Sequence, residues 1–314
     1  MTRKEIGGVV LAVAVFGLLA CLPLLKDSSY LLSLSVEIAM YTVLATSWAL
    51  FSGPTHYISL ATAAFYGLGA YVVAAGINVV PYPILVGIAG IGGAVLAALV
   101  GLATLRLSGV YFVIFTLGLA ELIRQTVTWV QNNFTGSRGL YVLTDITQNI
   151  IFWQLLALAA LVFLVGWLVA RSRLGFALRI IGNDELVAAH SGINSAAAKL
   201  ILFVISGVFA AVVGAVVAPR FTYIEPAIAF TPELSFQVVI MALLGGVHRL
   251  WGPVVGVIPF TALWELIAAR FPTQTVLLLG IAFLLIVYFI PNGVVGRIES
   301  VINRLGARGG SRRG

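Results

Sequence analysis

Long apolar runs, separated by short polar segments, fill most of the chain. A helix that crosses a membrane needs roughly 20 consecutive, mostly apolar residues. Ten runs of about this length are bounded by turn residues or charges, and the eighth is rather short. The pattern predicts ten membrane-spanning helices at about 7–25, 31–51, 58–77, 83–104, 109–130, 151–170, 199–219, 233–248, 252–270 and 275–290.

The stretch Phe51–Tyr71 interrupts this pattern with a helix-breaking sequence and then a series of small residues. The Ser-Gly-Pro-Thr sequence at 52–55 predicts a helix end, which a membrane tolerates only at its water boundary or beside a wet cavity. The small residues that follow recur at helical spacing, which predicts a face where another backbone can approach closely. Helix packing alone also accounts for each of these positions. The small face comprises Ser59, Ala63, Gly67, Ala70 and Ala74.

Composition and charge define the fold class. Hydrophobic residues make up 61% of the chain, charged residues 9%, and the mean hydropathy is +1.10, whereas a soluble domain carries about a quarter charged residues. With the N-terminus inside, thirteen Lys and Arg residues fall in predicted cytoplasmic segments and four in outer loops, as the positive-inside rule requires. We therefore expect an all-α, polytopic membrane protein with both termini in the cytoplasm. The net charge of +7 follows from the same rule and needs no nucleic-acid partner.

The domain organisation is simple. We expect one transmembrane domain over residues 1–297 and a basic cytoplasmic tail over 298–314. Ten spans could form two inverted halves of five, although no residue-level repeat is visible. The sequence up to Cys21 also resembles a lipoprotein signal, but because the apolar run continues directly into further spans, we interpret it as the first span.

The cytoplasmic segment 171–198 is long enough to have a role of its own. Asn183 or Asp184 can cap a short helix through Ala188 and Ala189, and Gly192 can end it. This helix would expose an apolar face that needs a partner, because large exposed apolar surfaces mark interaction sites. The predicted apolar face comprises Leu186, Val187, Ala188 and Ile193.

Charged residues inside predicted spans are few and costly, on the order of 2.5–3.5 kcal/mol each. Glu121 and Arg124 lie one turn apart in the fifth span, so that they can neutralise each other, either as a structural pair or on a permeation path. Glu37 and Glu265 have no basic neighbour in sequence and need a partner across the bundle, water or a proton. Proton coupling through them would indicate an ion-coupled secondary transporter.

The sequence contains none of the motifs expected of several other functions. A single cysteine and three scattered histidines give no metal-ligand spacing. No lysine follows a glycine, so there is no Walker A loop, and no Gly-x-Ser-x-Gly or His-Glu-x-x-His motif occurs. A membrane enzyme is therefore unsupported, and any ATP hydrolysis must take place on another chain.

Several motifs, in order over about residues 35–296, carry a family resemblance. They are Ser59–Tyr71; Arg106–Phe112 with Thr116-Leu-Gly118, Glu121 and Arg124; Ser172–Arg179 with Asp184-Glu185, Gly192-Ile-Asn194 and Lys199; Leu244-Gly-Gly246 with Trp251-Gly-Pro253 and Gly256; and Pro291-Asn-Gly293. In these segments the chain resembles the permease subunits of branched-chain amino acid ABC importers of the LivM type.

The resemblance implies a division of labour. A second homologous permease would pair with this chain, two ABC ATPases would use ATP and Mg²⁺ below the membrane, and an extracytoplasmic binding protein would deliver the substrate. The chain itself would bind no cofactor, would contact lipid, and would lie in a bacterial inner membrane. The ATPase-coupling residues would be Arg173, Gly175, Asn183, Asp184, Glu185, Ala188, Ala189 and Gly192, and the candidates for the path or helix seam are Ser59, Thr62, Ala63, Gly67, Glu121 and Arg124.

Two departures from the family pattern bear on the substrate. Ala61-Thr62 stand where the family usually has Gly-His, and His248-Arg249 stand where it commonly has Gly-Ser or Gly-Thr. Relatives in this family carry urea, short amides or other amino acids. Uptake of branched-chain or related amino acids is the expectation, with a urea or short-amide permease as the alternative within the class.

Overall fold

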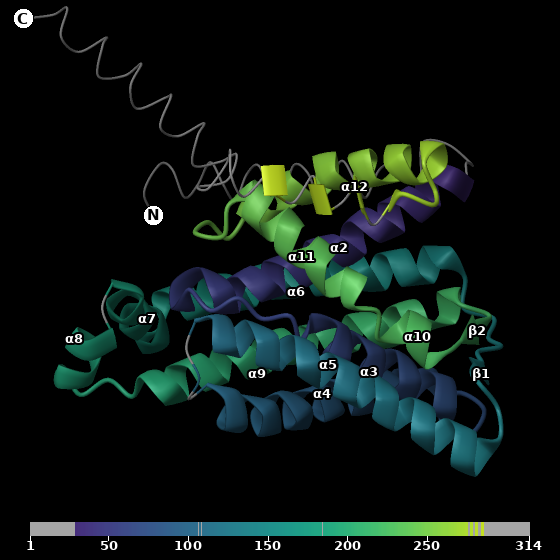
Figure 1. Cartoon of the computed structure of the whole chain (residues 1–314), viewed down its shortest axis with the longest axis horizontal. Helices are drawn as coiled ribbons and strands as arrows, with labels where there is room; N and C mark the ends of the chain where they lie inside the picture. Colours follow the sequence, from purple (N-terminus) through teal and green to yellow (C-terminus); the bar gives the residue numbers. More distant parts are fainter. Residues whose placement is uncertain are drawn as a thin grey trace, which may run out of the picture.

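The computed structural model describes residues 29–105, 107, 109–183, 185–275, 277, 278, 280, 281, 284 and 285. The helices form an elongated bundle with α7 and α8 at one end and a short sheet, β1–β2, at the other (Figure 1). The elements are α2 (Ser29–Thr55), α3 (Thr62–Gly76), α4 (Tyr82–Thr104), α5 (Val110–Val130), the π-helix η1 (Gln131–Thr135), β1 (Leu140–Tyr141), α6 (Gln148–Arg171), α7 (Arg173–Asn183), α8 (Glu185–His190), α9 (Ser195–Val217), the 3₁₀ helix η2 (Ala218–Arg220), β2 (Tyr223–Ile224), α10 (Pro226–Ala229), α11 (Pro232–Gly245) and α12 (Gly252–Arg270).

Within these described ranges, seven helical stretches are long and apolar enough to cross a membrane. The chain is a polytopic, predominantly α-helical membrane protein, as predicted. Eight of the ten predicted ranges overlap described helices, from α2 to α12. The first span, the region around Cys21, most of the last span and the tail 298–314 lie outside the described residues. The count of ten and the sides of the termini therefore stay predictions.

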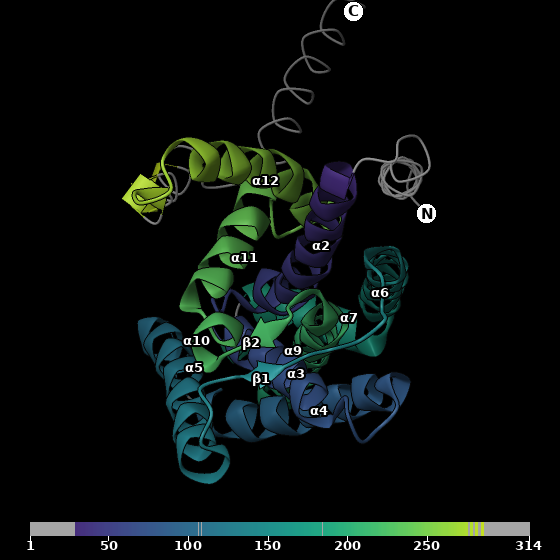
Figure 2. The ribbon, with the colours of Figure 1, turned by 90° about the vertical axis from the view of Figure 1, so that its right-hand side faces the viewer.

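Helix α9 is central to the packing. It lies against α4 and α3 and also contacts α2 and α6 (Figure 2). A Cβ on Gly69 would lie 1.8 Å from the carbonyl oxygen of Ala211, and one on Gly214 would lie 2.0 Å from that of Tyr66. These glycines let the backbones of α3 and α9 touch, which is how small residues serve helix packing in membranes.

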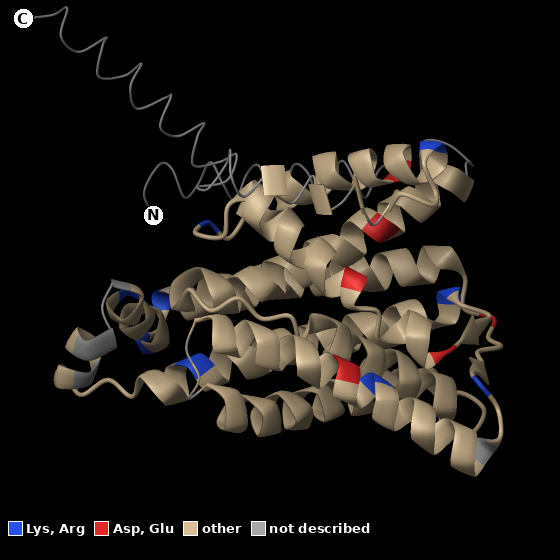
Figure 3. Cartoon of the chain, viewed as in Figure 1, with Lys and Arg blue, Asp and Glu red and all other residues tan. Residues whose placement is uncertain are grey.

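The two ends of the bundle differ in their acidic residues. Among the residues coloured by charge in Figure 3, Lys and Arg lie at both ends, whereas acidic residues lie in the middle and toward the sheet but not at the end with α7 and α8. By the positive-inside rule, the α7–α8 end is expected to face the cytoplasm. We call it the basic end and the opposite end the strand end. At the strand end, β1 and β2 pair antiparallel, Leu140 with Ile224, and so link two outer loops that the sequence did not connect.

The prediction for the third span was wrong. Residues 58–77 do not form one helix, because α3 begins only at Thr62 and has 15 residues. The helix break was also placed too early, since α2 continues through Ser52, Gly53 and Pro54 to Thr55. Pro54 cannot donate an amide hydrogen to the Leu50 carbonyl, but the helix ends one residue later, and the amide of His56 still donates to Ser52 O at 2.9 Å.

Candidate functional site

An extended stretch of chain runs between α2 and α3, over residues 56–61, and we call it the central segment. It begins at His56, which has a positive φ of 59°, an uncommon conformation for a residue with a side chain. Tyr57 is partly buried and Ile58 is exposed, whereas Ser59, Leu60 and Ala61 are buried. Non-helical backbone at membrane depth is tolerated only where its polar groups are satisfied by protein or water.

Side chains from three different helices satisfy the central segment. The indole Nε1 of Trp48 on α2 donates to the carbonyl of Ser59 at 2.8 Å. The amide of Leu60 donates to Thr116 Oγ1 on α5 at 3.1 Å. The hydroxyl of Ser235 on α11 donates to the carbonyl of Leu60 at 2.9 Å. The position of the segment is thus tied to α2, α5 and α11 together.

Two short helices begin at this place. Ser235 Oγ also accepts the amide hydrogen of Ala63 at 2.9 Å, so the first turns of α3 and α11 meet at one hydroxyl. From there α3 runs toward the strand end and α11 toward the basic end (Figure 1). Interrupted helices whose N-terminal turns lie inside the membrane offer peptide N–H groups and hydroxyls to polar solutes. The first turn of α11 also carries an acidic residue, Glu233.

The predicted seam residues occupy different parts of this region. Ala63 and Thr62 are buried in the first turn of α3, whereas Ser59 lies in the central segment and does not share the helix face predicted for it. Gly67 does serve close packing, because a Cβ there would lie 2.2 Å from the ring of Phe230. The small face of α3 is therefore real from Ala63 onward.

The predicted charged pair forms, but away from the central segment. Arg124 Nε donates to the Glu121 carboxylate at 2.8 Å, and a second bond joins Arg124 Nη2 to the same carboxylate. Gln125 Nε2 donates to Glu121 at 2.8 Å. Glu121 follows Thr116 by five positions, which places the two side chains about 140° apart around the helix axis. Thr116 faces the interior and Glu121 faces the outside of the bundle.

Glu265 on α12 is hydrogen-bonded to a tyrosine of α2. Tyr30, in the first turn of α2, donates a hydrogen bond from its hydroxyl to the carboxylate of Glu265 on α12. Glu265 thus has a neutral partner from another helix, as the sequence required. Farther along α2, the hydroxyl of Tyr41 donates to Gln237 on α11 in the interior.

The segment 171–198, predicted to be cytoplasmic, contains a helix that the sequence interpretation missed. Helix α7 buries Leu178 and Ile181 against the bundle and leaves Phe176 67% exposed. A Cβ on Gly175 would lie 2.3 Å from Val169 O at the end of α6. A Cβ on Gly182 would lie 2.9 Å from Pro54 O, in the last turn of α2. The end of α7 therefore rests directly on the end of α2, next to the central segment.

Helix α8 is the predicted short helix, and it ends as predicted. Gly192 has φ of +74°, and the amide of Ile193 donates to Ala188 O at 3.0 Å, the pattern of a Schellman C-cap. The predicted exposed face was wrong for Ala188, which is fully buried, while Val187 is 53% exposed. Arg173 is exposed. Asp184 and the side chains of Asn183, Glu185, Leu186 and Ala189 lie outside the description.

His248, where the chain departs from the family pattern, meets His56 at the basic end. The rings of His56 and His248 have centroids 5.9 Å apart. Gly53 lets this turn approach α2, since a Cβ there would lie 2.4 Å from Val247 O. His248 thus lies beside the start of the central segment, a proximity that sequence order alone does not reveal.

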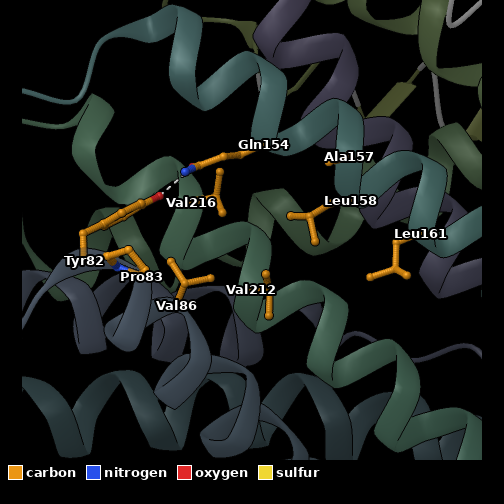
Figure 4. Close-up of a pocket in the computed structure, with 9 residues that line it drawn as sticks. All are labelled: Tyr82, Pro83, Val86, Gln154, Ala157, Leu158, Leu161, Val212 and Val216. Carbon is orange, nitrogen blue, oxygen red and sulfur yellow. Dashed lines mark hydrogen bonds between the residues drawn. The ribbon is translucent and has the colours of Figure 1, made fainter.

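A groove of about 430 Å³ lies elsewhere, between α4, α6 and α9 (Figure 4). Its walls are mostly aliphatic, and its polar element is a hydrogen bond of 2.8 Å from the Tyr82 hydroxyl to Gln154. It contains none of the predicted path residues. It offers too little hydrogen bonding for a polar solute, since burying a charge without partners is very unfavourable.

Three residues of the site escaped the sequence interpretation: Trp48, Thr116 and Ser235. Each is a polar or amphipathic side chain in a predicted span, and each is buried. A polar or amphipathic residue inside a predicted span was a usable signal of a hydrogen-bonded position, because buried polar groups need partners. Their common target was not foreseeable, since the residues that they bond lay in a range predicted to be helical.

Comparison with known proteins shows which family the chain belongs to. The family model described as "Branched-chain amino acid transport system / permease component" matches residues 30–289, most of the chain. The chain belongs to this family. It is a transport permease and not an enzyme.

Two relatives of this permease are similarly distant. The high-affinity branched-chain amino acid transport system permease protein LivM of Salmonella typhimurium LT2 is 26% identical over 302 residues, which cover 83% of this chain and 70% of that protein. LivM of Escherichia coli K12 is 26% identical over 293 residues, 82% of this chain and 68% of that protein. No solved structure matches the permease.

Proposed function

We propose that this permease is the membrane-spanning subunit of an ATP-driven ABC importer for branched-chain or related amino acids in a bacterial inner membrane. Two separate ATPase subunits drive it, a second homologous permease completes it, and an extracytoplasmic binding protein delivers the substrate. Its spans number ten, with both termini in the cytoplasm and a five-plus-five inverted arrangement. The opposed short helices α3 and α11, which start at one hydroxyl and run apart, support that arrangement.

One observation carries the mechanism: the cytoplasmic helices rest on the interrupted crossing. Gly182, at the end of α7, packs against Pro54, and the central segment begins two residues after Pro54. A push on α7 and α8 is thus transmitted to the end of α2 and to the segment that Trp48, Thr116 and Ser235 hold. Movement of the ATPases can in this way change the course of the chain at membrane depth.

The surface that receives the ATPases is the exposed apolar part of α7 and α8. Phe176 and Val187 are 67% and 53% exposed, and exposed apolar surfaces of this kind mark interaction sites. Arg173 and Gly192 flank it and are exposed as well. Gly175 and Ala188, by contrast, act within this chain, because both are packed inside it.

The substrate class follows from the polar groups at the break. A zwitterionic amino acid carries two charges that cannot enter lipid uncompensated. The first turns of α3 and α11 offer peptide N–H groups, the hydroxyl of Thr62 and the carboxylate of Glu233, and the central segment adds the hydroxyl of Ser59. Apolar neighbours such as Leu60 and Phe65 suit an aliphatic side chain. Concentrating a solute a thousandfold costs about 4 kcal/mol, which favours ATP-driven uptake.

The test is transport by proteoliposomes of defined composition. We expect uptake of leucine, isoleucine or valine only when the second permease, both ATPases, the binding protein and internal ATP are present. A Walker A variant of the ATPases is the control that keeps assembly and removes hydrolysis. Uptake by this chain alone under a proton or sodium gradient would refute the proposal. ATP-driven uptake of urea or a short amide, with no uptake of amino acids, would refute the substrate class only.

A further inference from the structure

Helix α5 carries charge on its outer face halfway along a membrane span. It lies at the edge of the bundle (Figure 2). Only 17% of its span is buried inside the bundle, the lowest share among the seven candidate spans. The side chain of Glu121 is 42% exposed and that of Arg124 is 27% exposed. Gln125, which donates to Glu121, is exposed too. Glu121 stands at position 12 of the 21 residues of α5, so this polar group lies near the membrane centre.

A second feature of the same face is an open glycine. A Cβ on Gly118 would meet nothing within 4 Å, although glycine weakens a helix compared with any larger residue. Gly118, Glu121, Leu122 and Gln125 follow one another at helical spacing and lie on one stripe. Nothing among the described residues requires Gly118 to be small, whereas a helix from outside would use the space to approach closely.

We infer that this stripe of α5 is the interface with a transmembrane helix of the second permease subunit. Glu121, Arg124 and Gln125 bond one another, but the exposed parts of this charged group would still face lipid in the middle of the span, which is costly. A neighbouring protein helix with polar groups can satisfy these exposed parts, and the glycine admits its backbone. The inference rests on the proposed function, because it takes the second permease as the partner.

Helix α4 provides the matched contrast. It also has an exposed glycine, Gly87, where a Cβ would meet nothing within 4 Å, and Ile91 one turn later is 69% exposed. Helix α4 contains no charged residue, so lipid covers that face without penalty. Gly87 and Ile91 on α4 thus correspond to Gly118 and Leu122 on α5, where Leu122 is 62% exposed.

The experiment uses photo-crosslinking in the intact complex. A benzophenone amino acid replaces Leu122 in one variant and Ile91 in the other, and the complex is irradiated in native membranes. Peptide mass spectrometry then identifies the adduct. We expect the Leu122 position to crosslink to a transmembrane peptide of the second permease and the Ile91 position to crosslink to lipid. Adducts of the Leu122 position with lipid, or with this chain's own residues 1–28 or 286–314, would overturn the inference.

A substitution pair tests the glycine. Gly118→Leu fills open space and favours helix, so the subunit itself should fold. We expect co-purification of the second permease to fall at least tenfold in this variant and to stay unchanged in Gly87→Leu. Equal recovery in both variants, or equal loss, would overturn the inference. Because ATP-driven uptake by the unmodified complex is measured separately, failure of the proposed function is distinguishable from failure of this interface.

Discussion

Replacing Ser235 by alanine removes the hydroxyl at which α3, α11 and the central segment meet. The Ala63 amide would lose its acceptor, and the Leu60 carbonyl would lose its donor, both at 2.9 Å. Leaving a buried polar group unsatisfied costs about 1–3 kcal/mol, so two such groups destabilise this junction by at least about 2 kcal/mol. Every 1.4 kcal/mol is a factor of ten, which makes local opening about 30 times more populated.

Hydrogen–deuterium exchange of the assembled complex measures this opening. Peptides that cover residues 57–66 should exchange about 30-fold faster in Ser235→Ala, while those from α6 should not change. Uptake should fall, because the interrupted crossing no longer has a fixed position. The matched control is Thr261→Val on α12, since the Thr261 hydroxyl is buried and has no hydrogen-bond partner among the described residues.

The reasoning would be refuted by unchanged exchange at 57–66 in Ser235→Ala. It would equally be refuted if Thr261→Val accelerated exchange at 57–66 as much, because the effect would then not come from the two lost hydrogen bonds. A second variant, Thr116→Val, removes the acceptor of the Leu60 amide alone. It should show a smaller acceleration, about fivefold, since it leaves a single group unsatisfied at a cost of about 1 kcal/mol.

Two further predictions concern glycines at close approaches. In Gly182→Val, the new Cβ would lie 2.9 Å from Pro54 O, and such overpacking costs about 1–3 kcal/mol. We expect the complex to continue to hydrolyse ATP while the amount of substrate taken up per ATP falls. Unchanged uptake per ATP would contradict the proposed coupling. In Gly214→Val, the Cβ would lie 2.0 Å from Tyr66 O inside the α3–α9 contact. We expect this variant to lose its monodisperse protein peak in size-exclusion chromatography. Full recovery of folded protein would show that these backbones are not in contact.

Much of the membrane architecture could be predicted from apolar run lengths, and the interrupted helix could not. The run 58–77 has the composition of a span, and nothing in it marks Ala61 as the residue before a helix start. The break exists because Trp48, Thr116 and Ser235, which lie far away in sequence, supply hydrogen bonds that a helix would otherwise make internally. The break was predicted at residues 52–55 because proline lacks an amide hydrogen and disfavours a helix, whereas α2 continues through Pro54 to Thr55.

The candidate site was predicted unevenly for similar reasons. The pairing of Glu121 with Arg124 and the helix end at Gly192 are local features, and both could be foreseen from spacing. Helix α7 was missed because the apolar residues Leu178 and Ile181 occur within a basic loop, where charge suggested solvent. Burial of Ala188 depends on how α8 folds back on the bundle, which no local pattern encodes.

The residues that hold the backbone of the central segment in place are mostly different from the residues whose side chains form its surface. The side chains that bond the backbone of Ser59 and Leu60 come from α2, α5 and α11, outside the segment, whereas Ser59 Oγ accepts the Ala61 amide from within it at 3.3 Å. Side chains of the segment that make no such bond, such as those of Leu60 and Ala61, can therefore be exchanged while the backbone keeps the same course through the bundle. Ala61, where this chain departs from the usual family pattern, is one of them, and Thr62 follows it as the first residue of α3. Specificity in such a permease can diverge by substitution at a few positions, with the scaffold that holds them left intact.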